Sequence, residues 1–230
     1  MKKTAPIALL LLSLASGTTA YADHPWRHDH LGLSLYAGSF SLEGPAVTAM
    51  PDGGEQDVDM YGLRAEGHVL LGDAWYARGV TDLSRLEGGG GLVQANASIG
   101  TIRSLVTADT WSLDGYLQVG VEYALSSGLD GYATNPNFDG TGSGRSGDAF
   151  GGSAEIGLSF GFWRDSRVGL FAKYLNFGDG DGVSFGVNLG HDLNETWTVT
   201  VGLDAVWVSD PGIHIDLDYQ RISLGLLRRF

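Results

Sequence analysis

The segment from Trp111 to Leu125, WSLDGYLQVGVEYAL, alternates apolar and polar residues almost without interruption. In an extended strand, Trp, Leu, Val and Tyr would lie on one side, and Ser, Asp, Tyr, Gln, Gly and Glu on the other. A soluble sandwich would bury the apolar side, whereas a transmembrane barrel would turn it toward lipid. The choice between them depends on how the pattern recurs along the chain.

Ten segments of this kind recur, and short connections alternate with generally longer ones. The predicted strands are 31–41, 57–71, 74–86, 92–106, 111–126, 149–162, 166–178, 182–191, 196–208 and 214–230. Outer-membrane barrels have an even number of strands, short periplasmic turns and longer external loops. In this chain, the Gly- and Ser-rich segment 127–148 is predicted to be such an external loop. The sequence therefore predicts an all-β, antiparallel, transmembrane up-and-down β-barrel of ten strands. Eight strands are the alternative count, and a soluble β-sandwich is the rival fold.

The first 22 residues have the features of a secretory signal peptide. Lys2 and Lys3 give a positive start, residues 7–14 are apolar, and residues 20–22 form an A-x-A cleavage site. We therefore predict a signal peptide at 1–22 and one barrel domain at 23–230. The predicted location is the outer membrane of a Gram-negative bacterium.

Charge and cysteine content exclude some partners and some sources of stability. The formal net charge of −13 argues against nucleic acid as a partner. The sequence contains no Cys, so no disulfide can form and stability must come from the fold itself. No pattern in the chain indicates a cofactor.

The tryptophans mark the ends of the predicted strands. Trp favours a membrane interface, where its ring is in an apolar region and its N–H stays hydrated. Four of the six lie beside the four short turns, and another lies at the opposite end of its strand. The predicted interface residues are Trp75, Trp111, Trp163 and Trp197 at the short turns, and Trp207 at the other end.

The polar sides of the strands would face the lumen. An Arg or Lys on the lipid side near the bilayer midplane would cost about 2–4 kcal/mol, and nearly every mid-strand charge lies on the opposite side. Either these charges pair and fill the lumen, or small residues on the facing wall leave a narrow pore. The predicted lumen residues are Arg64, Glu66, His68, Arg78, Asp82, Glu122, Glu155, Lys173, Asp204 and Arg221.

Two polar groups near the external strand ends resemble the catalytic groups of omptin proteases. Asp57 and Asp59 precede one strand body, and His214 lies close to Asp210 and Asp216 near another. Omptins are ten-stranded outer-membrane barrels that activate water with an Asp pair and an Asp–His pair. The resemblance implies a remote alternative in which Asp57 and Asp59 form the pair, and Asp210 or Asp216 partners His214.

No other arrangement in the sequence predicts catalysis or metal binding. His68 and His191 have no nucleophile or acid partner at a recognisable spacing, and no G-x-S-x-G occurs. His24, His28 and His30 are read as a flexible polar lead-in to the first strand rather than as metal ligands. We therefore predict no catalytic residues, no metal and no enzyme activity.

The whole pattern resembles small bacterial outer-membrane barrels, among them the OmpA-like and OmpW-like families. The resemblance is carried by the signal, the alternating strands, the Trp-marked turns and the last strand, ISLGLLRRF, which ends in Phe230. It implies that Phe230 is part of the signal read by the barrel-assembly machinery, and that lipid and lipopolysaccharide surround the protein. The predicted role is structural, or surface interaction through external loops with an unknown ligand. A narrow porin is the alternative.

Overall fold

The computed structural model describes residues 29–42, 56–87, 89–127, 147–162, 165–178, 180–209 and 217–230. Within them, no helix is long and apolar enough to cross a bilayer. The predicted signal peptide, Trp163, His214 and most of segment 127–148 lie outside the described residues. The strands are β1 His30–Leu42, β2 Gln56–Leu70, β3 Trp75–Leu86, β4 Gly91–Thr107, β5 Trp111–Ser127, β6 Gly147–Phe162, β7 Ser166–Asn176, β8 Asp181–Asp192, β9 Trp197–Val208 and β10 Leu217–Arg229.

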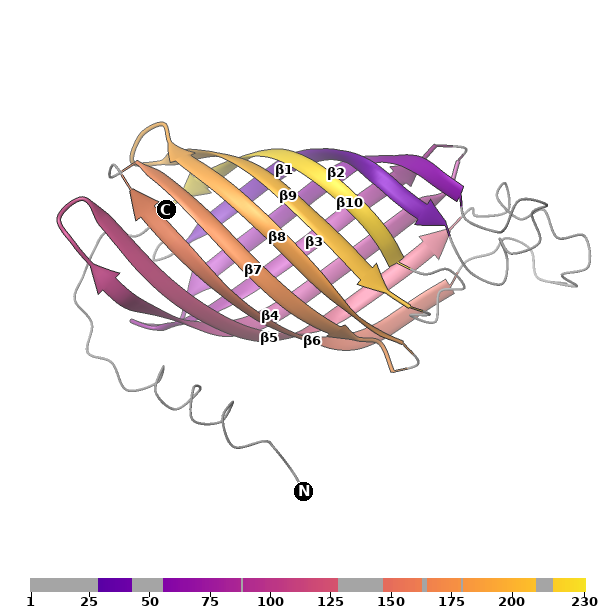
Figure 1. The fold of residues 1–230 in the computed structure, drawn as a ribbon, viewed down its shortest axis with the longest axis horizontal. Coiled ribbons are helices and arrows are strands. Elements are labelled where there is room, and N and C mark those ends of the chain that lie inside the picture. Colours follow the sequence, from indigo (N-terminus) through magenta and orange to yellow (C-terminus); the bar gives the residue numbers. More distant parts are fainter. Residues whose placement is uncertain are drawn as a thin grey trace, which may run out of the picture.

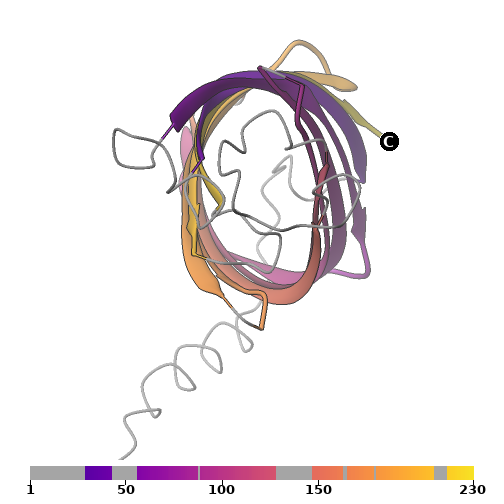
Figure 2. The same ribbon diagram turned by 90° about the vertical axis from the view of Figure 1, so that its right-hand side faces the viewer.

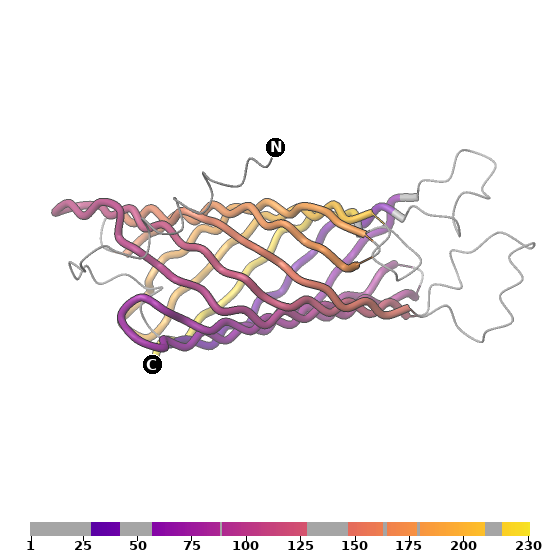
Figure 3. Tube along the Cα trace, turned by 90° about the horizontal axis from the view of Figure 1, so that it is seen from below, coloured from indigo at the N-terminus to yellow at the C-terminus, as the bar shows by residue number. Residues whose placement is uncertain are grey.

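Each strand pairs antiparallel with the next, and β1 pairs with β10 to close the ring (Figures 1 and 2). Ten strands are therefore confirmed, and the alternative of eight is wrong. A closed ring also excludes the two-layer sandwich. The ten predicted segments match the ten strands with differences of a few residues at their ends. The β4–β5 hairpin extends beyond its neighbours at the short-turn end (Figure 3).

The alternation of residue types sorts side chains between the outside and the inside of the ring. On β1, Leu31, Leu33 and Leu35 point outward, and Leu35 is 69% exposed. The next residue, Tyr36, points inward and is 5% exposed. The protein thus has an apolar outer surface and a partly polar interior, the reverse of a soluble globule.

Several interior glycines leave room for an aromatic ring on a neighbouring strand. A Cβ added to Gly157 on β6 would lie 2.4 Å from the ring of Tyr116 on β5. A Cβ on Gly62 would lie 2.4 Å from the Tyr36 hydroxyl oxygen. Glycine inside these strands therefore lets a ring lie flat against the wall, and this explains its presence away from turns.

We expect Gly157→Ala to destabilise the barrel by about 1–3 kcal/mol, because the added methyl group would force the Tyr116 ring to move. The matched control is Gly152→Ala on the same strand, where the added Cβ would meet nothing closer than 3.8 Å. Urea unfolding of the refolded protein in detergent, followed by Trp fluorescence, gives both values. Equal stability of the two variants would show that Gly157 is not needed for this packing.

Candidate functional site

The candidate site is the inside of the barrel, where the polar sides of the strands meet. All ten residues that the sequence assigns to the lumen lie on inward-facing positions, and we call this set the charged belt. Nine of them line one cavity: Arg64, Glu66, Arg78, Asp82, Glu122, Glu155, Lys173, Asp204 and Arg221. The tenth, His68, is buried closer to the short-turn end.

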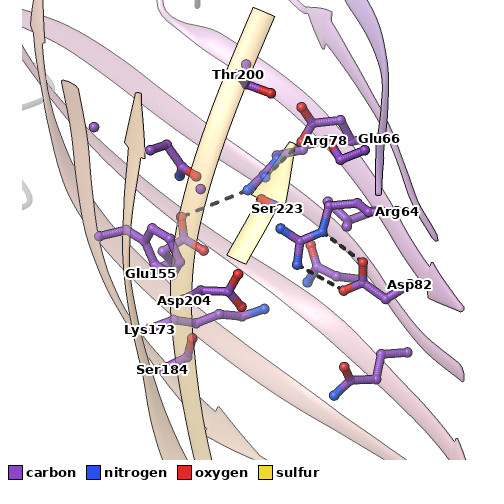
Figure 4. Close-up of a pocket in the computed structure, with 18 of the residues that line it drawn as sticks. Arg64, Glu66, Arg78, Asp82, Glu155, Lys173, Ser184, Thr200, Asp204 and Ser223 are labelled. Carbon is purple, nitrogen blue, oxygen red and sulfur yellow. Dashed lines mark hydrogen bonds and ion pairs between the residues drawn. The ribbon is translucent and has the colours of Figure 1, made fainter. Parts of the chain in front are cut away.

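Asp82 forms ion pairs with two arginines, Arg64 on β2 and Arg221 on β10. Arg64 Nε and Nη2 donate to its two carboxylate oxygens at 2.8 and 3.0 Å (Figure 4). Arg221 Nη2 reaches the same carboxylate at 3.1 Å, and Arg221 Nε donates to Asp204 at 2.8 Å. The Arg221 guanidinium also lies over two tyrosine rings, 4.8 and 5.0 Å from their centroids. These contacts tie β10 and β9 to β3 and β2 across the lumen.

A second group of contacts is centred on Arg78 of β3. Its Nη2 donates to Glu66 at 3.1 Å, and its Nη1 lies 4.0 Å from Glu155 on β6 (Figure 4). The Tyr116 hydroxyl donates to Glu155 at 2.8 Å. Because β4 and β5 stand between β3 and β6 in the ring, Arg78 also bridges the lumen.

Lys173 forms its ion pair with a residue other than its partner in the strand register. The register places Lys173 opposite Glu155 on β6. Its ammonium nitrogen instead lies 2.6 Å from Glu122 on β5, and Asn96 donates to the same carboxylate at 2.6 Å. Every acid and base among the nine cavity-lining belt residues therefore has an opposite charge within 4.0 Å.

His30 and His68 form a stacked pair at the short-turn end of the belt. They are paired in the β1–β2 register, with ring centroids 4.8 Å apart and planes at 7°. Tyr76 lies against His68 at 4.7 Å, and Glu66 is 4.0 Å from His30 Nε2. The interpretation of His30 as flexible lead-in is therefore wrong, because it is the buried first residue of β1. His24 and His28 lie outside the described residues.

Asp192 forms an additional ionic cluster at the short-turn end, which the sequence analysis missed. Arg229 and Arg167 lie 3.1 and 3.6 Å from its carboxylate, and the Thr198 hydroxyl donates to it at 2.5 Å. Extending the inward parity to the first residues of β7 and the last residues of β10 would have found both arginines.

An apolar layer crosses the barrel at the opposite, long-loop end, and the sequence analysis also missed it. Its thirteen members face inward and are at most 8% exposed. Every strand except β8 contributes at least one of them, and Phe177 directly follows β7. The sequence signal was present, because the inward positions change from polar to apolar near these strand ends. The apolar layer comprises Tyr36, Phe40, Val58, Met60, Leu86, Leu92, Ala124, Ala149, Leu175, Phe177, Val206, Val208 and Tyr219.

A cavity of about 160 Å³ remains beside the charged belt. Figure 4 shows Arg64 and Asp82 on one side of it, and Asp204, Lys173 and Ser184 on the other. The second side is formed largely by short inward residues of β8, β9 and β10, which we call the small-residue wall. The part of the wall that lines the cavity comprises Ser184, Asn188, Gly190, Thr198, Thr200, Gly202 and Ser223.

Aromatic side chains lie near both ends of the outer surface. Trp75, Trp111 and Trp197 are exposed at the short-turn end, and Trp207 is exposed at the other end of β9. At a rise of about 3.3 Å per residue and a tilt of about 40°, the stretch from Trp197 to Trp207 spans roughly 25 Å along the barrel axis. Phe230 is exposed at the short-turn end, with Arg228 over its ring at 5.1 Å.

The structure places the proposed aspartate pair on the outside of the barrel. β2 and β10 do flank β1, as a protease-like arrangement requires. However, Asp57 and Asp59 lie on the outward positions of β2 and are exposed, while Val58 between them enters the apolar layer. Asp57 accepts a hydrogen bond from Ser41 at 2.9 Å. The pair therefore does not line the lumen, and the partner candidates at 210, 214 and 216 lie outside the described residues.

One histidine has a serine partner that its sequence spacing did not reveal. Ser166 Oγ and His191 Nδ1 are 3.0 Å apart on adjacent strands near the short turns. No acidic side chain bonds His191 among the described residues, and activation of a serine generally needs a histidine oriented by a third group. Within the described part of the chain, no group of three or more His, Cys, Asp or Glu is placed to hold a metal ion.

Several solved structures are similar to this barrel. The outer-membrane protease OmpT from Escherichia coli is 12% identical, with a TM-score of 0.48 over 93% of this chain and 100% of that one. An outer-membrane channel from Pseudomonas putida F1 is 9% identical, with a TM-score of 0.46 over 94% and 100%. The translocator domain of the autotransporter NalP from Neisseria meningitidis is 10% identical, with a TM-score of 0.43 over 97% and 95%. No family model and no curated protein sequence matches the chain.

Identities and TM-scores at this level identify neither a family nor an activity. The functional proposals below therefore depend on the residues of this chain.

Proposed function

We propose that this chain is an integral outer-membrane β-barrel whose lumen is closed at rest, and that it has a non-enzymatic structural or surface-interaction role. The observation that carries the proposal is the apolar layer, which crosses the interior of the barrel. This layer is separate from the apolar outer surface, whose side chains point outward. The interior of a water-filled outer-membrane barrel is polar. A continuous layer of buried Phe, Met, Leu and Val side chains would instead exclude ions from one end of this lumen.

Membrane insertion is supported by the height and composition of the outer surface. The estimate of roughly 25 Å between the two Trp levels on β9 matches the apolar band of outer-membrane barrels. The outward residues between these levels on β9 are Val199, Val201, Leu203 and Ala205. We infer that lipid and lipopolysaccharide contact this band, with the short turns in the periplasm and Phe230 serving the barrel-assembly machinery.

We expect Leu203→Arg to destabilise the barrel in a bilayer by about 2–4 kcal/mol, because Leu203 is 55% exposed on the outer surface between the two Trp levels. The matched control is Leu193→Arg, an exposed leucine in a short turn, where a charge near the interface costs about 0–1 kcal/mol. Urea-dependent folding into phospholipid vesicles measures both. Equal effects at the two positions would contradict a membrane-embedded outer surface.

A surface-interaction role assigns the function to the external loops, the longest of which is segment 127–148. Deleting residues 130–146 should leave the heat-dependent gel mobility of the folded barrel unchanged, because β6 begins at Gly147. The same deletion should weaken binding of whole cells to host or abiotic surfaces, or reduce envelope resistance to detergent. If the deletion changed neither surface binding nor detergent resistance, this loop would have no part in the proposed function.

A narrow channel is the second candidate function, and the cavity beside the small-residue wall favours it. Conduction would require the apolar layer to open, because the layer separates this cavity from the long-loop end. The channel hypothesis therefore predicts current steps in wild type that change in Arg78→Gln. The closed-lumen hypothesis predicts no steps in wild type or in Arg78→Gln.

A further inference from the structure

The cavity in the barrel has hydrogen-bonding groups on one side that the protein itself does not use. Ser184, Asn188, Thr200 and Ser223 all line it from the small-residue wall. Their side chains make no hydrogen bond to another described residue. Hydrogen-bonding groups in a buried polar site that have no protein partner are expected to bond to water or to a polar solute.

The six basic and six acidic side chains around the cavity balance as a set, and each is already paired. Arg64 and Arg221 face Asp82 and Asp204, while Arg78 faces Glu66 and Glu155. Lys173 faces Glu122, and the two arginines at the short-turn end face Asp192. An ion entering this cavity would find every opposite charge already engaged with a partner within 4.0 Å. It would lose hydration without full compensation, which is costly in a buried site. A neutral solute would not carry this cost.

We propose that this cavity is a binding site for a small, neutral, hydroxyl-rich solute, that is, a short polyol. Polyol hydroxyls both donate and accept, so they can satisfy the serine and threonine hydroxyls and the Asn188 amide together. The volume of about 160 Å³ corresponds to about five waters at ~30 Å³ each, which suits a three- or four-carbon polyol. The lining extends to Arg167 and Arg229 at the short-turn end. This inference goes beyond the proposed function and does not depend on the external loops.

The test uses the refolded mature chain in detergent micelles and three probes of matched size. The probes are glycerol, the anion glycerate and the cation 3-aminopropane-1,2-diol, and saturation-transfer NMR reports binding of each. We expect a signal from glycerol that exceeds those from both charged probes. Thr200→Val and Ser223→Ala each remove one hydroxyl, and each should weaken glycerol binding about five-fold, the equivalent of one hydrogen bond of about 1 kcal/mol.

Two further variants separate the charge argument from general damage to the barrel. Thr81→Val removes a hydroxyl from an exposed position on the outside of β3, and should leave the glycerol signal unchanged. Asp204→Asn removes one negative charge from the matched set, and should shift the preference from glycerol toward glycerate. Heat-dependent gel mobility confirms that each variant is folded.

The absence of a glycerol signal from the folded wild-type barrel would overturn the proposal. Equal signals from the three probes would also overturn it, since charge matching would then select nothing. A wild-type signal that survives both Thr200→Val and Ser223→Ala would place the solute elsewhere. None of these results would decide whether the lumen conducts or whether the loops bind a surface, so failure here is distinguishable from failure of the proposed function.

Discussion

Asp82→Ala is expected to destabilise the barrel by about 3–5 kcal/mol, one of the two largest effects that the structure predicts. Removing one partner of a buried ion pair leaves the other charge uncompensated, and this costs far more than the intact pair contributes. Asp82 receives Arg64 through two hydrogen bonds and Arg221 through a third contact. Arg221 keeps Asp204 after the substitution, so Arg64 is the charge left without a carboxylate at hydrogen-bond distance. Urea unfolding in detergent measures the loss.

Two controls show whether the Asp82 effect comes from the unpaired guanidinium. Asp148→Ala removes a carboxylate from an exposed, outward position on β6 and should cost little. Adding Arg64→Met to Asp82→Ala should recover part of the stability, because the buried charge is then gone. The belt would lose its structural role if Asp82→Ala and Asp148→Ala were equally stable.

Phe40→Ala is expected to cost about 3–5 kcal/mol as well, and it also tests the apolar layer as a barrier. Phe40 is 0% exposed and stacks against Tyr219 at 6.0 Å between ring centroids. Its removal deletes buried apolar contacts and leaves a void at the long-loop end of the lumen. Phe150→Ala is the matched control, because Phe150 is 68% exposed on the outer surface near the same end. Equal costs for the two substitutions would contradict the packing described for the layer.

The strand alternation was sufficient to predict the ring, and the structure places the ten residues assigned to the lumen on inward positions. A period of two fixes which side chains share a face, and the outer apolar surface leaves little freedom in register. Arg64 with Asp82 and Arg221 with Asp204 follow from this register, since each pair is directly opposite on neighbouring strands. Pairs of this kind can be read from a sequence once the hairpins are aligned.

The contacts that cross the lumen could not be predicted in this way. Arg221 and Asp82 are separated by β1 and β2 around the ring, and their contact depends on barrel diameter and side-chain reach. Lys173 shows the limit more directly, because its register partner is Glu155 but its ammonium group bonds Glu122. The apolar layer was missed for a different reason. Inward positions were assumed to remain polar along the whole strand, whereas Phe40, Met60 and Leu92 are inward and apolar.

Single-channel recording of refolded residues 23–230 in a planar bilayer tests the closed lumen most directly. Wild type, Phe150→Ala and Phe40→Ala would be compared after heat-dependent gel mobility has shown each to be folded. The apolar layer predicts that wild type and Phe150→Ala are silent, and that Phe40→Ala opens in discrete steps because its barrier is thinner. Discrete steps in wild type that shift in Arg78→Gln would contradict a closed lumen and establish a small pore in its place.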